Sequence, residues 1–438
     1  MKPADKLIED SKHFCILPWI HFHGWPNGQV MPCCVADSQM PVSKIEDDVS
    51  IIDMMNSDKY KEMRIKMMND EYVPECRRCY ELEAVGTWTM RKSQNAVRGE
   101  DCIDILEDTN MDGSIDEFQM KYMDTRFSNL CNMKCRSCGP SCSNLWGEEK
   151  IEEYGKEEML RIFDLTDVHV SNNSNGIFME KLKGHLSDVE ECYFAGGEIL
   201  VTPEHYECLD YWVENGLQDQ VHLNYTTNMS KLTYKDKQGT RDLFDYWKQF
   251  PNIEIWASLD SIGPEAELIR KGTRWNKIVD NLKRIKEEAP HIRLGFTPTI
   301  SIWNIWNYHK LFDFLMDEGI MDPTIPPRLN ILTNPEWANI KILPEFAIAK
   351  LREIYYAYEL KYDLYNGESD LNGGMSNTFK VLNAALNGCD PNPDKFLEFI
   401  LENDKMDNSR TEQVIETLPE LKEIYEWART ESDRKSVV

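Results

Sequence analysis

Three cysteines stand close together in the stretch RFSNLCNMKCRSCGPSC, residues 126–142. Cys131, Cys135 and Cys138 have the spacing CxxxCxxC, and Cys142 follows four residues later. Three thiolates on one loop are able to bind three irons of a cubane 4Fe–4S cluster, so that the fourth iron has no protein ligand. Structural zinc sites favour two separated CxxC-like pairs and ferredoxin clusters use four cysteines, so the spacing fits neither type well. We interpret Cys142 as a buried or free thiol beyond the loop.

A second group of cysteines lies in the first eighty residues. Its members are Cys15, Cys33, Cys34, Cys76 and Cys79. Twelve residues separate Cys15 from Gly28, four more lead to Cys33, and a CxxC pair follows at 76–79. Four thiolates at such positions are able to bind one 4Fe–4S cluster, and they also suit tetrahedral Zn²⁺. Cys34 is an alternative to Cys33, because both follow the turn at Gly28.

Composition excludes several classes of protein. The chain has 438 residues, 41% of them hydrophobic, and a formal net charge of -27. Phosphate binding needs clustered cations, so we expect neither a nucleic-acid partner nor an anionic membrane surface. The first residues, MKPADKLIED, contain no apolar signal region, and no window approaches the length of a membrane span, so we expect a cytoplasmic protein. Thirteen cysteines in a reducing compartment indicate metal ligands rather than disulfides.

The order of apolar segments predicts an α/β fold. Six short apolar or β-branched segments alternate with amphipathic helical stretches between residues 119 and 335, which is typical of βα units around a parallel sheet. The six segments are 118–128, 188–196, 220–227, 252–260, 291–300 and 327–332. We therefore predict three regions: a Cys-rich region over 1–118, the βα region over 119–335 and a helical region over 336–438.

The three-cysteine loop directly follows the first strand of the predicted βα series. In parallel βα folds, ligand sites are built from loops at the carboxyl ends of the strands. The position of the loop is therefore suited to a cofactor site.

The CxxxCxxC loop is similar to that of the radical S-adenosylmethionine (SAM) superfamily, and further motifs of that family follow in order. The segment YFAGGEILVTP resembles the family's GGE element, NYTTNMSKL resembles its T-N-G segment, and WASLDSIGPEAELIRKG resembles its S-[IL]-D-G stretch followed by an arginine. Met229 replaces the usual glycine of the second motif, and Ser137 replaces the common aromatic residue before the third cysteine. The positions that match as SAM-binding residues are Gly196, Gly197, Glu198, Asn228, Ser258 and Arg270.

This resemblance implies a fold and a reaction. The fold would be a partial (β/α)6 TIM-like barrel with a 4Fe–4S cluster on Cys131, Cys135 and Cys138. The reduced cluster would cleave SAM into methionine and a 5′-deoxyadenosyl radical, which abstracts a substrate hydrogen. The cofactor carries the difficult chemistry and the protein orients it and excludes water, so no side chain is predicted to be catalytic.

The N-terminal cysteines resemble the SPASM/twitch type of auxiliary iron–sulfur domain. The pattern C-x12-G-x4-C plus CxxC matches one half of a full SPASM pattern, and the second half is absent, which favours a twitch-like domain with one auxiliary 4Fe–4S cluster. The resemblance implies Cys15, Cys33, Cys76 and Cys79 as its ligands. Zinc remains the alternative metal.

Several functions and partners stay open at this stage. Auxiliary-cluster enzymes often act on peptides, so we predict a peptide or protein substrate, with a small metabolite as the alternative. A small redox protein would supply the electron. A protein of a different class, a non-catalytic iron–sulfur or zinc protein, would have no use for the predicted SAM-binding residues. The helical region after Pro344 would either bind a partner or cover the barrel.

Overall fold

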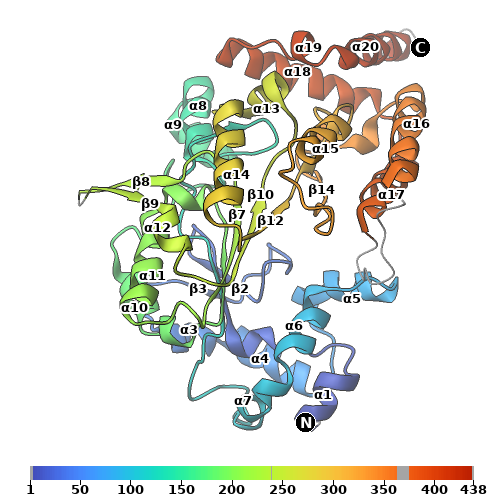
Figure 1. The fold of residues 1–438 in the computed structure, drawn as a ribbon. Coiled ribbons are helices and arrows are strands. Elements are labelled where there is room, and N and C mark those ends of the chain that lie inside the picture. Colours follow the sequence, from blue (N-terminus) through green and yellow to red (C-terminus); the bar gives the residue numbers. More distant parts are fainter. Residues whose placement is uncertain (1–2, 238, 363–373, 437–438) are drawn as a thin grey trace. The chain divides into compact units, whose positions relative to one another are not determined.

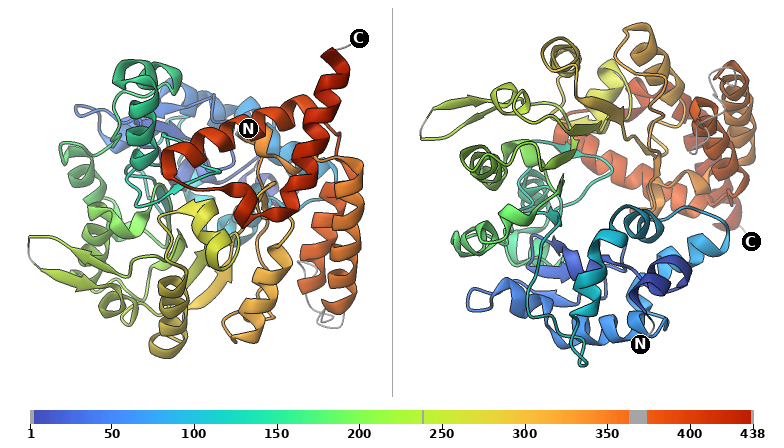
Figure 2. Two further views of the ribbon diagram at one scale, coloured as in Figure 1. Left: turned by 90° about the horizontal axis from the view of Figure 1, so that it is seen from above. Right: turned by 60° about the horizontal axis from the view of Figure 1, so that its bottom comes forward.

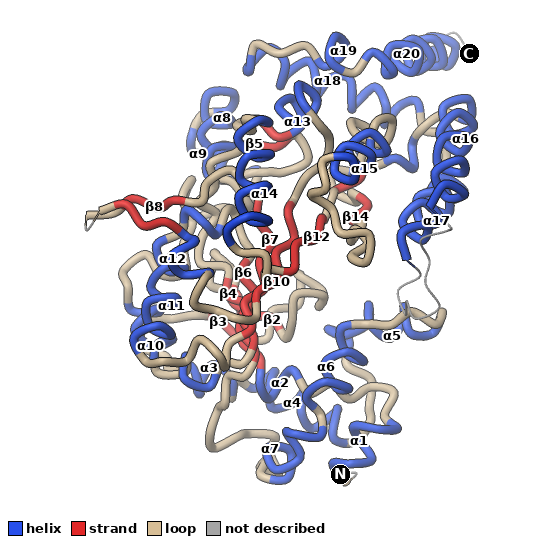
Figure 3. The backbone as a smooth tube through the Cα atoms, viewed as in Figure 1, coloured by secondary structure: helices blue, strands red, loops and turns tan. Residues whose placement is uncertain are grey.

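We analysed a computed structural model, which describes residues 3–237, 239–362 and 374–436 (Figure 1). It is a mixed α/β fold, and its strands are drawn in red among blue helices in Figure 3. Eight strands belong to one mainly parallel sheet in the order β12-β10-β7-β6-β4-β1-β2-β3. Within the described residues, none of the helices has the length and apolar character that crossing a membrane requires.

Five of the six predicted strand segments contribute to this sheet. They contain β4 (Tyr122–Thr125), β6 (Glu191–Phe194), β7 (His222–Thr227), β10 (Ile253–Ala257) and β12 (Arg293–Phe296). The sixth segment forms β14 (Asn330–Ile331), which pairs in parallel with β13 (Thr299–Ile300) in a separate two-stranded sheet. The short β14 leaves few backbone groups for pairing, which is consistent with its small sheet.

The chain folds into two compact units that each collect several stretches of sequence. Unit 1 comprises Met1–Leu130, Leu160–Asn224 and Gln249–Asn252, and unit 2 comprises Cys131–Met159, Tyr225–Lys248 and Ile253–Val438. The N-terminal cysteines therefore belong to unit 1 and the CxxxCxxC loop belongs to unit 2.

Unit 1 begins with short helices and a hairpin. Strand β1 (His21–Gly24) pairs antiparallel with β2 (Gln29–Met31), which pairs with β3 (Ser43–Lys44). On its other side β1 pairs in parallel with β4. Gly28 has a φ of +82° in the hairpin turn, a conformation that favours glycine. The helices of this region are α1 (Ala4–Asp10), α2 (Leu17–Ile20), α3 (Ile51–Met55), α4 (Asp58–Met68), α5 (Arg77–Ala84), α6 (Met90–Arg98) and α7 (Ile103–Glu107).

Local sequence explains where these helices begin. The side chain of Ser57 accepts a hydrogen bond from the backbone N–H of Tyr60 and so caps α4. Thr89 caps α6 in the same way. The later part of unit 1 contributes α10 (Ile177–Lys183), β6 and α11 (Pro203–Glu214), and Pro203 occupies the first turn of α11, where its missing N–H leaves no bond unmade.

Unit 2 contains the end of the sheet and most of the remaining helices. A short strand, β5 (Lys134–Cys135), pairs antiparallel with β11 (Arg270–Lys271), and β8 (Thr233–Lys235) pairs with β9 (Thr240–Asp242). The helices of the first part are α8 (Asn144–Tyr154), α12 (Leu243–Trp247), α13 (Gly263–Ile269), α14 (Trp275–Glu288) and α15 (Tyr308–Asp317), while α9 (Lys156–Ile162) crosses the unit boundary. Helix α14 is amphipathic, because Trp275, Ile278, Leu282 and Ile285 are buried at helical spacing.

After residue 344 the part of the chain that the structure describes is mainly helical. Its helices are α16 (Glu345–Tyr362), α17 (Gly374–Asn387), α18 (Pro393–Arg410), α19 (Val414–Thr417) and α20 (Lys422–Ser436). Helices α16 and α17 pack as one pair and α18 packs on α20, and the second pair is coloured red in Figure 2. Aromatic rings fill the second interface, where Phe396 lies 6.0 Å from Tyr425 between ring centroids.

Candidate metal and cofactor sites

Four N-terminal cysteines line one small cavity in unit 1. Its thiols come from Cys15, which precedes α2, from Cys33, which follows β2, and from Cys76 and Cys79 at the start of α5. Leu17, Val35 and Ala36 supply apolar walls, and Arg91 from α6 reaches the same cavity. The hairpin thus brings together cysteines that lie more than sixty residues apart in sequence.

The electrostatics of these thiols also indicate that they are neighbours. Burial and the proximity of the Cys79 thiol together raise the pKa of Cys15 to about 12. Burial likewise raises the pKa of Cys33, to which Cys15 and Cys79 add. Burial raises the pKa of Cys76, and the nearby thiols of Cys33, Cys15 and Cys79 raise it as well. Without a cation, such a set stays protonated, whereas a metal would take four thiolates. The donor set therefore fits either a 4Fe–4S cluster or Zn²⁺.

Cys34 lies apart from this cavity. Burial raises its pKa, and the next contribution comes from Asp124 on strand β4. Cys33 lines the cavity and Cys34 does not, so the structure favours Cys33 between the two candidates.

Two polar side chains of α6 hold the Cys15 segment. Asn95 donates to the carbonyl oxygen of Phe14 at 3.0 Å and accepts from the backbone N–H of Ile16 at 2.9 Å, so it bridges both neighbours of Cys15. Arg91 donates to the Phe14 carbonyl at 2.8 Å and forms an ion pair with Glu83. Sequence analysis did not identify these two residues, because their only signal is a polar pair within a short helix.

The CxxxCxxC loop of unit 2 is ordered by hydrogen bonds from the residues that follow it. Asn144 accepts from the backbone N–H of Cys131 at 2.9 Å, and Trp146 donates its Nε1–H to the carbonyl oxygen of Cys135 at 2.7 Å. The backbone N–H of Cys138 donates to the same carbonyl at 3.0 Å. Cys142 is exposed, and its thiol lies beside that of Cys138. The hydrogen bond between the two side chains raises the pKa of Cys138, and burial raises it as well. Half-exposed thiols on an ordered loop suit a cluster that also contacts a small molecule.

A buried arginine anchors the loop to the C-terminal helices. Arg136 stands directly after Cys135 and has a fully buried side chain. Its Nη1 donates to Asn403 Oδ1 at 2.8 Å and its Nη2 donates to Glu412 Oε2 at 2.8 Å. The same Nη2 pairs with Asp407, and Nε donates to the carbonyl oxygen of Leu268 at 3.3 Å. The guanidinium is therefore satisfied by residues far along the chain, as a buried charge requires.

A second buried ion pair lies beside the first. Glu149 of α8 binds Arg410, with Nη2–Oε1 at 2.9 Å, and also pairs with Lys134. Burial opposes ionisation of Glu149, but Arg410 and Lys134 outweigh it and lower its pKa. Lys134 and Arg136 flank Cys135. Arg136 binds α18 and the loop after it directly, whereas Lys134 pairs with Glu149 of α8, which in turn pairs with Arg410 of α18.

Two of the predicted SAM-binding residues of unit 2 contact the three-cysteine loop. Arg270 is the strand partner of Cys135 across β5 and β11. Its Nε and Nη2 donate to the two carboxylate oxygens of Asp260 at 2.7 and 3.0 Å, so the guanidinium is held rigidly. Asn228 donates to Asn132 Oδ1 at 3.0 Å, within the three-cysteine loop. Ser258 donates its backbone N–H to the carbonyl of Thr227 at 2.8 Å.

The predicted GGE element lies in unit 1 after strand β6. Gly197 packs so closely on the chain before the three-cysteine loop that an added Cβ would lie 2.3 Å from the carbonyl oxygen of Leu130. Glu198 donates its backbone N–H to the same carbonyl at 2.8 Å, and its side chain accepts from the N–H of Leu200. Gly196 has a φ of +137°, which other residues rarely adopt. The glycines therefore allow the backbone at residue 130 to approach.

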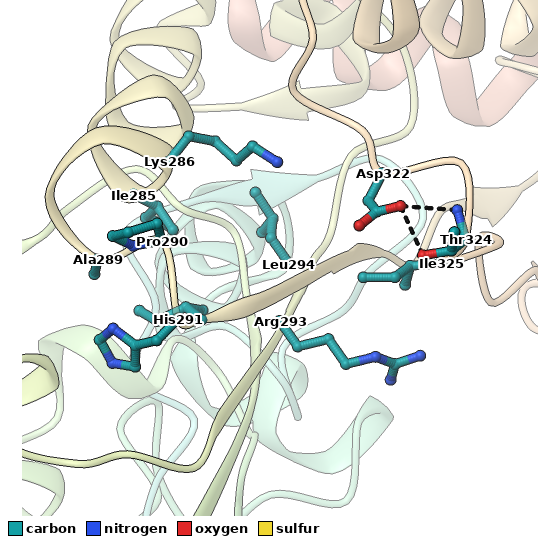
Figure 4. A pocket seen from close by; sticks show the side chains of 11 residues that line it. Ile285, Lys286, Ala289, Pro290, His291, Arg293, Leu294, Asp322, Thr324 and Ile325 are labelled. Atoms are coloured by element: carbon teal, nitrogen blue, oxygen red, sulfur yellow. Dashed lines mark hydrogen bonds between the residues drawn. The ribbon is translucent and has the colours of Figure 1, made fainter.

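The pocket in Figure 4 lies at the amino end of strand β12. It has a volume of about 420 Å³ and is lined by residues 285–286, 289–294, 322 and 324–325 of unit 2. Arg293, which opens strand β12, is among them, and Asp322 accepts two hydrogen bonds from Thr324 beside it. Ligand sites of parallel α/β sheets lie at the carboxyl ends of strands, so this pocket is not the candidate cofactor site.

Residues 15–80 match the family model of SPASM, described as an iron–sulfur cluster-binding domain. The matched segment contains all five N-terminal cysteines. The predicted likeness of this region to SPASM-type domains is thereby confirmed. No curated protein matches the sequence significantly.

Several solved structures resemble part of the chain. One is native anSMEcpe with bound AdoMet and the Cp18Cys peptide, with 12% sequence identity and a TM-score of 0.33 over 53% of this chain and 58% of that chain. Another is Streptococcus suis SuiB bound to S-adenosylmethionine, with 13% identity and a TM-score of 0.32 over 65% of this chain and 57% of SuiB. The chain thus matches less than two thirds of the length of either protein.

Proposed function

We propose that this protein is a radical SAM enzyme built on a partial (β/α)6 barrel, with its SAM-binding 4Fe–4S cluster on Cys131, Cys135 and Cys138. The observation that carries the proposal is the construction of the loop around Cys135. Its backbone is fixed by Trp146, its neighbour Arg136 is buried and fully bonded, and Arg270 lies across the strand pair. A free-thiol loop has no need of such anchoring, whereas a cluster that leaves one iron open must be held from outside.

The predicted SAM-binding residues would orient the cofactor. Gly196, Gly197 and Glu198 present backbone groups, while Asn228, Ser258 and Arg270 present polar side chains from unit 2. When bound, a reduced 4Fe–4S cluster and SAM supply a 5′-deoxyadenosyl radical that removes a hydrogen atom from the substrate. Arg270 lies beside Cys135 and is paired with Asp260. Burial raises the pKa of the Cys135 thiol, Arg270 lowers it and Asp260 raises it, so the positive charge of a bound cluster would have to favour the thiolate.

The N-terminal cavity would hold a second, auxiliary 4Fe–4S cluster on Cys15, Cys33, Cys76 and Cys79. The likeness of residues 15–80 to an iron–sulfur domain supports iron rather than zinc. Four cysteines complete the ligand set, so this cluster would transfer electrons or order the domain rather than bind SAM. A small redox protein would serve as electron donor.

For the substrate we propose a peptide or protein side chain. SPASM-type auxiliary domains resemble those of enzymes that modify peptides, which favours a polypeptide over a small metabolite.

The test is anaerobic reconstitution followed by reduction in the presence of SAM. We expect about eight irons per chain, two 4Fe–4S clusters, and formation of 5′-deoxyadenosine that depends on reductant. A colourless protein with stoichiometric zinc and no SAM cleavage would reject the proposal. For the substrate, SAM-loaded enzyme would be used to capture peptides from native lysate, with masses compared before and after reduction. Turnover of a small metabolite without any modified peptide would contradict only the polypeptide part.

A further inference from the structure

One face of the unit 1 sheet is polar across four neighbouring parallel strands. The strand register places His21 beside Tyr122, and Tyr122 beside Glu191. The backbone N–H of His222 donates to the carbonyl of Glu190, which places His222 beside Glu191. Two residues further along each strand, the same face carries His23, Asp124, Tyr193 and Asn224.

The opposite face of these strands is apolar and fully buried. It carries Phe22, Met123, Cys192 and Leu223. Phe22 packs on Phe178 of α10 with ring centroids 5.8 Å apart. Parallel sheets are normally apolar on both faces because helices cover both. A polar face on this parallel part of the sheet therefore indicates a ligand-binding surface.

The proton positions of His23 follow from its neighbours. Trp25 Nε1 lies 2.8 Å from His23 Nε2, and an indole nitrogen only donates, so Nε2 must accept. The proton of His23 is then on Nδ1, which lies 2.9 Å from the backbone oxygen of Asp124 and 3.0 Å from its carboxylate Oδ2. Both ring nitrogens of His23 are thus occupied, and the residue positions Asp124.

His21 Nε2 and the carboxylate of Asp124 present buried lone pairs on this face. His21 Nδ1 lies 3.0 Å from the carbonyl oxygen of Tyr122 and donates to it, so Nε2 carries a lone pair. Burial lowers the pKa of His21 to about 4, which keeps the ring neutral. His21 Nε2 and both Asp124 carboxylate oxygens are buried and accept no well-formed hydrogen bond from the residues that the structure describes. A buried imidazole nitrogen and a buried carboxylate whose lone pairs are not fully satisfied are unusual in a folded protein and call for a partner.

Asp124 remains ionised in this environment. Burial alone would raise the pKa of its carboxyl group, but His23 and Arg126 lower it to about 2. Arg126 Nε lies 3.7 Å from Asp124 Oδ1. A negative carboxylate and a neutral imidazole acceptor, with ligand atoms within 4.8 Å of one another, match a group that carries several N–H donors and a positive charge.

We infer that His21 and Asp124 form a binding site for a primary ammonium group, which donates one N–H to His21 Nε2 and another to the Asp124 carboxylate. The binding site itself does not depend on the proposed function. Only the assignment of the ammonium group to the substrate rests on that function. The half-buried residues Glu191, Tyr193, His222 and Asn224 continue the polar face on the neighbouring strands.

A metal ion fits the same residues less well. His23 has no lone pair left for a metal while Trp25 donates to it, which leaves His21 and Asp124 as ligands. Zinc sites in proteins use at least three protein ligands.

The experiment compares two cations of equal charge by NMR of the reconstituted holoprotein labelled with [15N]histidine. Methylammonium carries three N–H donors and tetramethylammonium carries none. We expect methylammonium to shift the Nε2 resonance of His21 saturably and tetramethylammonium to leave it unchanged. The resonance would be assigned with His21→Gln. A third sample receives Mn²⁺ at one ion per chain.

Variants sharpen the comparison. Asp124→Asn removes the charge and should weaken methylammonium binding about tenfold or more. The control is Glu204→Gln, a buried carboxylate of unit 1 that already accepts from Asn173 at 2.9 Å, and it should leave binding unchanged. The comparison of methylammonium with tetramethylammonium uses the unmodified protein, so its result does not depend on whether a variant folds.

Three results would overturn the inference. They are an unchanged His21 resonance with methylammonium, an equal response to tetramethylammonium, and selective broadening of His21 by Mn²⁺ without an amine response, which would identify a metal site. Because this binding assay does not require SAM cleavage, failure of the proposed enzyme function and failure of the ammonium site are separate results.

Discussion

The two cysteine groups differ in what holds them in place. In unit 1, Cys15 is fixed by Asn95 and Arg91, which lie within the same N-terminal hundred residues. In unit 2, Arg136 beside Cys135 binds Asn403 and Glu412, more than 260 residues further along the chain. The first site is held by nearby residues and has four thiols around a small cavity. The second has three cysteines on a half-exposed loop that is held by residues far along the chain.

This difference has a chemical consequence. A cluster with four cysteines adds to the stability of the segment that binds it, because each ligand bond replaces a missing packing contact. A cluster with three cysteines keeps an iron for another ligand, so the protein must fix the loop by other means. Removing a cysteine should therefore mainly destabilise the first site, and it should mainly abolish chemistry at the second.

The largest expected effect comes from the loop cysteines. Cys131→Ala, Cys135→Ala and Cys138→Ala should each abolish reductive SAM cleavage, because the cluster loses one of only three ligands. The measurement is 5′-deoxyadenosine formed by reconstituted protein with reductant. Cys142→Ala is the control and should retain cleavage, although its thiol lies beside that of Cys138. An equally inactive Cys142→Ala variant would show that the ligand assignment is incorrect.

The N-terminal cysteines should respond in iron content and stability. Cys15→Ala should lower the iron content from about eight to about four per chain, and reductive SAM cleavage without substrate should persist. The thermal unfolding midpoint should fall, because the cavity loses its metal. The triple variant of the loop cysteines should also retain about four irons. If that triple variant holds no iron, the N-terminal cysteines do not bind a cluster.

Arg136 tests the long-range anchor. Arg136→Met leaves Asp407 and Glu412 without their buried partner, and breaking a buried ion pair lowers the free energy of unfolding by about 3–5 kcal/mol. Arg136→Lys keeps the charge and should recover part of the loss. The control, Arg284→Met, removes an arginine that pairs with Glu288 and Asp242 at the surface and should change stability by about 1 kcal/mol or less. Equal losses for both methionine variants would contradict an anchoring role.

The EPR signal of the loop cluster in Arg136→Met provides a second measurement of the anchoring role. We expect altered EPR line shape of the reduced loop cluster, while the N-terminal cluster keeps its signal. A change in both signals would indicate general unfolding instead of a local effect.

The sequence predicted the parts of the fold that local patterns determine. Alternating apolar residues identified five strands of the main sheet. The cysteine spacing indicated Cys15, Cys76 and Cys79 of the N-terminal cavity but left Cys33 and Cys34 as alternatives. The sequence did not predict that β1 would join the sheet beside β4, because strand pairing depends on contacts between distant segments.

The anchors of the candidate site were also not predictable. Nothing in the local sequence distinguishes Asn403 or Glu412 from the many polar residues of a helical region. The sequence left open whether this region binds a partner or covers the barrel. The bonds to Arg136 show that α18 and the loop after it contact the three-cysteine loop within unit 2. The contact of His23 with Asp124 was not predictable either, because it depends on the pairing of β1 with β4.

The smallest expected effect concerns the pH dependence of the second anchor. Arg410 and Lys134 lower the pKa of Glu149 below that of an unfolded glutamate, against the effect of burial. A carboxyl group with a lowered folded-state pKa contributes stability above its unfolded pKa of about 4.3, and this contribution is lost as the pH falls through the folded value. The thermal midpoint of the protein should therefore fall more steeply with acid, in this window, than that of Glu149→Gln. The control is Glu288→Gln, since Glu288 also has a lowered pKa, through Arg284 and Lys248, but is exposed to solvent and screened. If both glutamine variants flatten the acid limb equally, or neither does, the pair of Glu149 with Arg410 does not contribute to holding the three-cysteine loop.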